Sequence, residues 1–355
     1  MFFEDFHPEK VGDLYHGSDP SLTENGSIKG KPEDFIVEEI PAVAPSGAGE
    51  YLYLWLEKRN LSHDQLCQVL SQSLGVPYRD IGAAGLKDKR SVSRQHISVP
   101  ASYESQLCKL SDSGVNILDV SRHHQKLKTG YIKGNRFRIK VHEVGSLVDA
   151  EMRLNEAVTN GVPNFFGRQR FGSKGDTGYI GCAILQGNPV PKKFQMGHWK
   201  RLALSAAQSM VFNHYLHRRI CEYPRSQLLP GDVMKKNGGG VFRVEDIPSE
   251  QLRFLSGETN LLGPLPGKKL FPAADKALEF ENRCLSELGL DDELFNKLGK
   301  KLPGARRALW IRFEDISLVM DGKTASYSFD LPSGSYATVV LTQLLGAYPR
   351  EYKMD

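Results

Sequence analysis

The sequence predicts an α+β protein in which a strand-rich sheet domain is interrupted by an inserted segment of helices and loops. Apolar runs typical of strands occur near both ends of the chain, over about residues 28–142 and 306–329. A long helical pattern and stretches dense in glycine and proline fill the middle. Two consecutive domains would give a similar layout, so the residues leave both arrangements open.

Composition limits the class of protein. The chain has 355 residues, of which 40% are hydrophobic and 25% charged, as in folded globular proteins. Its five cysteines form no Cys-x-x-Cys pair, which predicts unpaired thiols in a reducing cytosol. No stretch reaches the roughly 18 apolar residues of a spanning helix, and the polar lead-in of residues 1–27 has no signal-peptide pattern. We therefore expect a cytoplasmic protein without a membrane segment.

The first part of the chain is expected to alternate strands with one clear helix. A short apolar run over 35–37 predicts a strand. Aromatic residues alternate with leucines over 51–56, which predicts a strand that is apolar on both faces and hence central. Ser62 begins a capping box and Gly75 is a typical helix end, so a helix is expected between them. A further strand is expected over 91–99.

The segment from Val120 to His142 is strongly basic and ends in an alternating pattern. Phe137 and Ile139 are expected on one face of a strand, and Arg136 and Arg138 on the other. The segment contains seven cations and no acidic residue. The seven are Arg122, Lys126, Lys128, Lys133, Arg136, Arg138 and Lys140. A solvated strand face and a surface that contacts a polyanion both explain this run.

Residues 162–172 combine three aromatic side chains with two arginines in a run too irregular for a helix face. Aromatic residues interleaved with arginines suit stacking on unpaired bases and contact with phosphates. A packed loop with aromatic anchors explains the same residues equally well. The nearby Gly172 and Lys174 do not complete a phosphate-binding loop, because Gly175 stands where Ser or Thr is required.

Helices and one hairpin account for most of the remaining chain. The spacing of apolar residues predicts helices over 146–160, 199–221, 273–288, 291–300 and 337–345. Asp321-Gly322 lies between two alternating runs, which predicts a β-hairpin over about 317–329. Residues 222–272 are dense in glycine and proline, so their strands are expected to be short.

The stretch 81–99 contains the main candidate for chemistry. Asp88 is a lone carboxylate that follows two glycines and is surrounded by cations. These cations are Lys87, Lys89, Arg90 and Arg94. Local composition alone favours charge balance in a solvated turn. If the stretch is a site instead, the cations keep Asp88 ionised, and it would act as a nucleophile or base rather than an acid.

Patterns for other chemistry are missing from the sequence. There is no zinc-ligand spacing, no glycine fingerprint of a dinucleotide site after a strand, and no Gly-x-Ser-x-Gly elbow. His123 and His124 are adjacent but have no partners at ligand spacing. We therefore expect no metal site.

Five motifs occur in a fixed order along the chain. They are Lys29 with Pro32–Phe35, Gly85–Lys89 followed by Gln95, Lys133–Phe137, Asn164–Gly172 and Leu331–Thr338. Together these motifs closely resemble those of the TruD family of tRNA pseudouridine synthases. The likeness extends from about Ile28 to the last helix, and several motifs in one order make a chance match improbable.

The resemblance implies a function and a set of site residues. It implies isomerisation of uridine to pseudouridine in tRNA, in bacterial members at position 13 of glutamate tRNA, with no cofactor and no metal. The catalytic aspartate of the family corresponds to Asp88. The substrate-binding positions correspond to Lys29, Phe35, Asn135, Phe137 and Tyr336. With tRNA as its partner, the protein is expected to be a monomer that requires no protein partner.

The resemblance also implies a fold and a division into domains. The expected fold is a mixed, largely antiparallel sheet with flanking helices, which is the pseudouridine synthase core, interrupted by an inserted α+β domain. The expected divisions are 1–160 and 309–355 for the two parts of the catalytic domain and 161–308 for the insertion.

Two other functions stay open. A catalytically silent RNA-binding module is the alternative function, and a globular protein with a solvated basic face is the least specific one.

Overall fold

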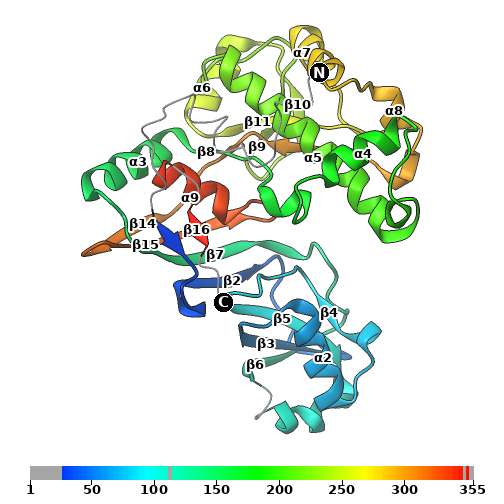
Figure 1. The fold of residues 1–355 in the computed structure, drawn as a ribbon, viewed down its shortest axis with the longest axis vertical. Coiled ribbons are helices and arrows are strands. Elements are labelled where there is room, and N and C mark those ends of the chain that lie inside the picture. The colour runs from blue at the N-terminus through cyan, green and yellow to red at the C-terminus, as the bar shows by residue number, and fades with distance from the viewer. Residues whose placement is uncertain (1–25, 111–113, 347–348, 352–355) are drawn as a thin grey trace. The chain divides into compact units, whose positions relative to one another are not determined.

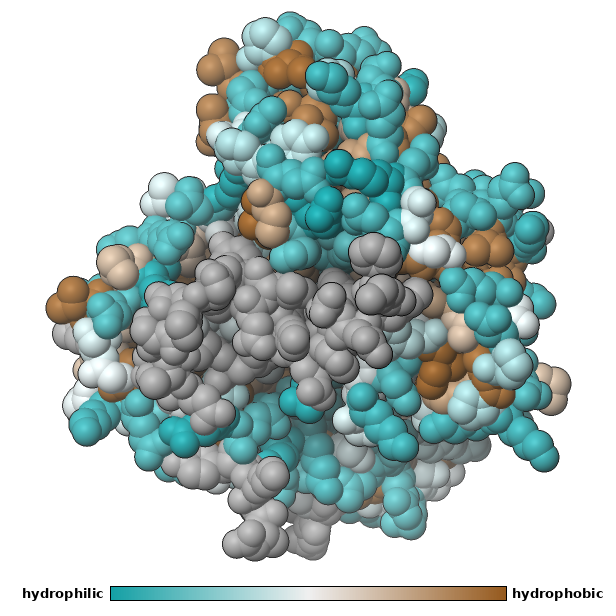
Figure 2. Space-filling view, turned by 45° about the horizontal axis from the view of Figure 1, so that its top comes forward, coloured by the Kyte–Doolittle hydropathy of each residue, from teal (hydrophilic) through white to brown (hydrophobic). Residues whose placement is uncertain are grey.

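A computed structural model of the chain describes residues 26–110, 114–346 and 349–351 (Figure 1). The expected lead-in of residues 1–27 therefore lies almost wholly outside the described residues. None of the helices that the structure describes combines the length and hydropathy needed to cross a membrane. On the face drawn in Figure 2, hydrophilic side chains predominate among the coloured residues, and hydrophobic ones occur in small groups.

The chain forms two compact units. We call them the sheet unit, which comprises the described residues of 22–160, 312–337 and 341–355, and the helical unit, which comprises 161–311 and 338–340. The chain thus leaves the sheet unit for one long segment, 161–311, and again for the three residues 338–340.

An eight-stranded sheet is the framework of the sheet unit, in the order β14-β15-β7-β2-β5-β3-β6, with β4 paired to β5. Its strands are β2 (Phe35–Pro41), β3 (Tyr51–Arg59), β4 (Gly82–Ala83), β5 (Val92–Pro100), β6 (Val115–His123), β7 (Ile132–Val141), β14 (Ile316–Asp321) and β15 (Thr324–Pro332). Only β2 and β5 pair in parallel among them. The predicted mixed, largely antiparallel sheet is confirmed.

Strands from both ends of the chain share this sheet. The antiparallel pairing of β15 with β7 places Phe329 opposite Phe137 and Leu331 opposite Asn135. The hairpin predicted at Asp321-Gly322 is confirmed, with Asp321 opposite Thr324. Two consecutive domains would not produce this pairing. A separate two-stranded parallel sheet joins β1 (Ser27–Ile28) to β16 (Arg350–Glu351).

The helix predicted between Ser62 and Gly75 is confirmed as α2 (His63–Leu74). The Ser62 side chain accepts a hydrogen bond from the Gln65 backbone, and Gly75 ends the helix with a φ of 75°. The apolar face of α2 packs on leucines of β3 and on Ile97 and Val99 of β5. Each fully buried leucine of this core contributes about 1.5–3 kcal/mol. This packing holds β5 in place, which is the strand that follows the β4–β5 loop.

The remaining helices of the sheet unit are short or lie at its margins. They are η2 (Pro32–Asp34), η3 (Tyr78–Asp80), η4 (Ala101–Leu110), α3 (Leu147–Asn160) and α9 (Ala337–Leu345). The helices predicted over 146–160 and 337–345 are therefore confirmed. Residues 338–340 of α9 are those grouped with the helical unit.

The long helix predicted over 199–221 is α5 (Gly197–Glu222), which organises the helical unit. It packs against α4 (Thr177–Leu185), where a Cβ on Gly181 would lie 2.0 Å from the Ala203 carbonyl oxygen. Only glycine permits this close approach of the two helices. The other helices are η5 (Arg168–Phe171), η6 (Lys192–Phe194), α6 (Ile247–Leu255), α7 (Asp275–Glu287), α8 (Asp292–Asn296) and η7 (Gly299–Lys301).

A four-stranded antiparallel sheet in the order β10-β9-β11-β12 completes the helical unit. Its strands are β9 (Val233–Lys236), β10 (Val241–Arg243), β11 (Thr259–Leu265) and β12 (Ala305–Ala308), and β8 (Val162–Pro163) pairs separately with β13 (Trp310–Ile311). Of the strands between residues 222 and 272, β9 and β10 are short, as predicted, whereas β11 has seven residues. The sequence did not predict α6, and the helix predicted over 291–300 is limited to the shorter α8.

The irregular segment 162–172 is a packed loop. Phe165, Phe166 and Phe171 are all buried. The guanidinium of Arg170 donates a hydrogen bond to Ser209 on α5 at 2.8 Å, and that of Arg307 lies 4.0 Å from the centre of the Phe166 ring. The interpretation that these aromatic side chains stack on unpaired bases is therefore wrong, because their rings are already enclosed by protein.

The basic segment ends in β7, whose side chains alternate as predicted. Phe137 and Ile139 are buried, whereas Arg136 and Arg138 are exposed. Arg136 forms a two-pronged ion pair with Asp330 on β15, at 2.9 Å for each hydrogen bond. Arg122 pairs with Glu104. Acidic residues from other parts of the chain thus neutralise some of the seven cations, which the local sequence did not reveal.

Candidate active site

Asp88 lies in the loop between β4 and β5, and its backbone is held by two side chains. The Asp88 carbonyl oxygen accepts hydrogen bonds from Lys58 Nζ at 2.9 Å and from Ser91 Oγ at 2.8 Å. Its carboxylate side chain remains 31% exposed. The loop therefore presents a carboxylate to solvent from an anchored backbone.

A cation from a distant part of the sequence lies beside the Asp88 carboxylate. Lys29 Nζ lies 3.5 Å from Asp88 Oδ2 and 2.9 Å from Glu351 Oε1, and only 4% of its side chain is exposed. The ammonium also lies 4.7 Å from the centre of the Phe35 ring. Lys29 follows β1 with a φ of 60°, in the left-handed region. A buried ammonium thus lies between two carboxylates and an aromatic face.

The four cations that flank Asp88 in sequence have different surroundings. Lys87 is buried and Lys89 is exposed. Arg94 donates to Glu57 at 3.0 Å and to Glu38 at 3.2 Å. Arg90 is half-buried, and one nitrogen of its guanidinium finds no hydrogen-bond partner among the residues that the structure describes. Among these four, Lys87 is the one drawn into the buried part of the site.

Lys87 connects the Asp88 loop to Asn135 through a buried ion pair. Lys87 Nζ lies 3.3 Å from Glu39 Oε2 and donates a hydrogen bond to Asn135 Oδ1 at 2.6 Å. The exposed fractions of the Lys87 and Glu39 side chains are 3% and 1%. Burial lowers the pKa of Lys87, and the nearby Glu39 carboxylate partly opposes this change. An ammonium can only donate hydrogen bonds, so the Asn135 oxygen faces Lys87 and its amide nitrogen points elsewhere.

Two of the three predicted aromatic residues, Phe35 and Phe137, form a buried row together with Phe329. The rings of Phe35 and Phe137 meet edge to face with centres 6.0 Å apart, and Phe137 lies 5.8 Å from Phe329. Tyr336 is half-buried at the N-cap of α9, five residues after Leu331, which lies opposite Asn135. The structure thus brings Lys29 to Asp88 directly, and Phe35 lies against Lys29 and Phe137 against Phe35. Asn135 is joined to the loop through Lys87, the residue before Asp88. Tyr336 is placed only by its position beyond β15.

Three groups at this site were not among the residues singled out from the sequence. They are Glu39, Lys58 and Glu351. Lys58 is 1% exposed, and its ammonium donates to the carbonyl oxygens of Leu61 at 2.5 Å and of Asp88 at 2.9 Å. Burial is the main cause that lowers the pKa of Lys58 to about 8; Asp88 opposes this shift and Lys87 adds to it.

The low pKa of Lys58 predicts a pH-dependent stability. Between about pH 8 and the ordinary lysine pKa of 10.5, the unfolded chain binds a proton that the folded protein releases, so the free energy of unfolding rises with pH. From pH 8 to about pH 9.5 the gain is up to about 2 kcal/mol, at about 1.4 kcal/mol per pKa unit. Urea unfolding across this range should show that the free energy of unfolding rises with pH in the natural protein but not in Lys58→Met. The same rise with pH in both proteins would contradict the low pKa of Lys58.

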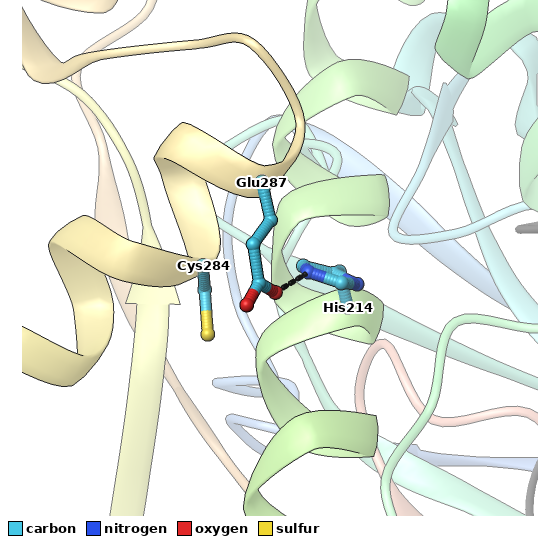
Figure 3. A group of neighbouring side chains, drawn as sticks. All are labelled: His214, Cys284 and Glu287. Carbon is cyan, nitrogen blue, oxygen red and sulfur yellow. Dashed lines mark hydrogen bonds and ion pairs between the residues drawn. The ribbon is translucent and has the colours of Figure 1, made fainter. Parts of the chain in front are cut away.

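A second polar group lies in the helical unit and could hold a metal ion by its composition. His214 on α5 faces Cys284 and Glu287 on α7, and their candidate ligand atoms all lie within 4.8 Å of one another (Figure 3). His214 Nε2 is 2.7 Å from Glu287, and Arg218 lies 3.2 Å from the same carboxylate. Burial raises the pKa of the Cys284 thiol to about 12. A protonated thiol and a carboxylate already paired with Arg218 suit a polar contact between two helices better than a metal site.

Comparisons with known proteins identify the family. A family model described as tRNA pseudouridine synthase D (TruD) matches residues 14–192 and 196–344. A protein named tRNA pseudouridine synthase D from Anaeromyxobacter sp. (strain Fw109-5) is 39% identical over 91% of this chain and 93% of its own. A protein of the same name from Thermus thermophilus is 38% identical over 96% and 93% of the two chains.

A solved structure agrees with these matches. The crystal structure of a protein from Methanosarcina mazei, described as a tRNA pseudouridine synthase D (TruD), superposes with a TM-score of 0.72. It is 27% identical in sequence and covers 93% of this chain and 95% of its own. The fold is that of a pseudouridine synthase, an RNA-modifying isomerase. The chain belongs to the tRNA pseudouridine synthase D (TruD) family. It is therefore an enzyme, which excludes the catalytically silent RNA-binding module.

Proposed function

We propose that Asp88 is the catalytic carboxylate for isomerisation of uridine 13 in glutamate tRNA. The observation that carries this proposal is the partly exposed Asp88 carboxylate on a backbone anchored by Lys58 and Ser91, beside the buried Lys29 ammonium. The residues proposed to bind the uridine are Lys29, Phe35, Asn135, Phe137 and Tyr336.

One carboxylate is sufficient for this chemistry. Breaking the bond between ribose and uracil leaves an electron-poor carbon on the ribose. A carboxylate can either stabilise this carbon or attack it and form a covalent bond. The departing uracil anion is stabilised by resonance, so no second carboxylic acid has to protonate it. The base then rotates and rejoins the ribose through carbon 5. The rings of Phe35 and Phe137 are buried, so their proposed part is to form the packed apolar support of the site rather than a face on which the base stacks.

Asn135 supplies a means of recognising uracil. Lys87 holds the Asn135 oxygen, so the Asn135 amide nitrogen is the group left to donate a hydrogen bond to the base. At carbon 4, uracil carries a carbonyl oxygen that accepts a hydrogen bond, whereas cytosine carries an amino group that donates one. The Lys87–Asn135 pair therefore favours uracil over cytosine.

We also propose that the protein acts as a cytoplasmic monomer without cofactor or protein partner, and that 161–308 is an inserted domain between the catalytic segments 1–160 and 309–355. The five free cysteines support a reducing compartment. The pairing of β15 with β7 supports a catalytic domain assembled from both ends of the chain.

The proposal is tested with the purified protein and unmodified glutamate tRNA. Chemical mapping should find pseudouridine at position 13 and unchanged uridine elsewhere. A transcript with cytidine at position 13 is the control and should contain no pseudouridine. Pseudouridine confined to another position would contradict the proposed target, and its complete absence from several tRNAs would contradict the proposed catalytic site.

A further inference from the structure

The start of α5 and the turn before it form an exposed surface of unusual composition. We call this surface the aromatic–basic patch, and it consists of Lys192, Lys193, Met196, His198, Trp199, Lys200 and Arg201. Trp199 is 49% exposed and Met196 80% exposed. Their apolar area is left in water although α5 buries most of its other large apolar side chains.

The basic side chains of the patch have no acidic residue near them in sequence. Between Asp176 and Glu222 the sequence contains no acidic residue. Within the described part of the chain, no ion pair is formed by any of the four cations Lys192, Lys193, Lys200 and Arg201. Some arginines of the same unit are neutralised: Arg218 and Arg283 both pair with Glu222, and Arg306 pairs with Glu281. The patch, in contrast to these arginines, keeps its positive charge.

The charges of the patch also oppose the helix on which they lie. The first turn of α5 contains no acidic residue, and Lys200 and Arg201 follow directly. Positive charge near a helix N-terminus is unfavourable by roughly 0.3–1 kcal/mol per group, because the helix dipole is positive there. Neither charge pairing nor helix stability accounts for these residues, so an external polyanion is the partner that their charge fits.

The patch also contains an aromatic ring placed to stack on a base. Trp199 meets the buried Phe194 edge to face with ring centres 6.0 Å apart, which holds the indole in place. Lys193 Nζ lies 5.3 Å from the centre of the Trp199 ring and 4.8 Å from that of Phe194. A flat, supported ring beside a cation on a flexible side chain matches the alternation of base and phosphate in a single strand.

We propose that the aromatic–basic patch binds unpaired nucleotides of the tRNA substrate, with one base stacked on Trp199 and the neighbouring phosphates bound by Lys193 and the other cations. This inference rests on tRNA being the substrate. Single-stranded loops are the part of an RNA whose bases are free to stack on a protein ring. The patch therefore contributes to affinity and takes no part in the chemistry at Asp88.

Two matched substitutions test the stacking. Trp199→Ala should raise the Kd for tRNA and the KM by about ten-fold, because stacking on an aromatic ring contributes that much or more, while kcat changes far less. Trp199→Phe keeps a flat ring and should recover most of the affinity. A Kd and KM for Trp199→Ala equal to those of the natural protein would overturn the proposal.

Salt dependence tests the phosphate contacts. Lys193→Ala should weaken binding to every tRNA and reduce the slope of log Kd against log salt by about one. Lys276→Ala removes an exposed lysine of α7 in the same unit and should leave both quantities unchanged. Equal slopes for Lys193→Ala and the natural protein would overturn the role of Lys193.

Photocrosslinking of the natural protein is independent of how any variant folds. A tRNA nucleotide attached within residues 192–201 supports the proposal, and crosslinks found only elsewhere overturn it. Binding of acidic peptides or anionic vesicles that depends on Trp199, without an effect on tRNA, would also overturn it. The two proposals fail separately. If the natural protein forms no pseudouridine, the proposed catalytic function is contradicted. If the enzyme is active but Trp199→Ala leaves the Kd and KM for tRNA unchanged, only the proposed role of the aromatic–basic patch is contradicted.

Discussion

Asp88→Asn should abolish pseudouridine formation while the fold and tRNA binding persist. The substitution removes the negative charge and the nucleophilic oxygen but keeps the size of the side chain. We expect kcat to fall by about 1,000-fold or more, as when a nucleophile is removed from an enzyme whose other parts remain in place. The measurement is single-turnover release of the hydrogen from carbon 5 of uridine, which leaves when that carbon joins the ribose.

The stability of Asp88→Asn should change little. Lys29 keeps its 2.9 Å contact with Glu351, and the hydrogen bonds from Lys58 and Ser91 reach the Asp88 backbone rather than its side chain. Asp119→Asn is the matched control, because it removes an exposed carboxylate from β6 of the same unit. An Asp88→Asn enzyme with the rate of the control would show that another group performs the chemistry.

The architecture of the sheet unit was readable from the sequence because its signals are local. Alternation along β7, the capping box at Ser62 and the Asp-Gly turn each lie within a few residues, and each specifies one element. The order of motifs then indicated that Asp88 is part of a site, which local composition alone did not. The sequence of residues 162–172 fitted a packed loop and a base-stacking segment equally well. Their burial depends on α5, which lies further along the chain, so the local sequence could not separate the two.

The ion pairs of the site could not be read in the same way. Lys29 and Glu351 are 322 residues apart, and their contact depends on the parallel pairing of β1 with β16. Two of the missed residues did leave a signal. Glu39 continues the buried face of Phe35 and Val37 along β2, and Lys58 continues the buried leucine face of β3. A charged residue at a core-facing position needs a partner, so each of these positions pointed to a buried polar contact.

The cations that flank Asp88 in sequence differ in the residues they contact. Lys87 and Asp88 are adjacent, yet Lys87 pairs with Glu39 and Asn135 while Asp88 contacts Lys29. Arg94 is one residue before the buried Gln95 on β5, and it pairs with Glu38 and Glu57. The cations near Asp88 in sequence are therefore divided among different partners.

Lys87→Met should cause the largest loss of stability among substitutions at the site. It leaves the Glu39 carboxylate, 1% exposed, without its cation, and breaking a buried ion pair from one side costs about 3–5 kcal/mol. Arg122→Met is the control, because it breaks a pair with Glu104 whose side chains are 44% and 48% exposed, and it should cost about 1 kcal/mol or less. Urea unfolding measures both values, and equal losses for the two variants would contradict a buried role for the Lys87–Glu39 pair.

A double substitution separates stability from positioning. Glu39→Gln combined with Lys87→Met removes both charges, so much of the lost stability should return, because an uncompensated buried charge is the main cost of the single change. The rate should not return with it. Without Lys87, the Asn135 amide is free to turn either face to the base, so kcat should stay low and discrimination between uridine and cytidine at the target position should weaken. If the double variant recovered both stability and rate, Lys87 would serve only to neutralise Glu39, and the orientation of Asn135 would have to come from another contact.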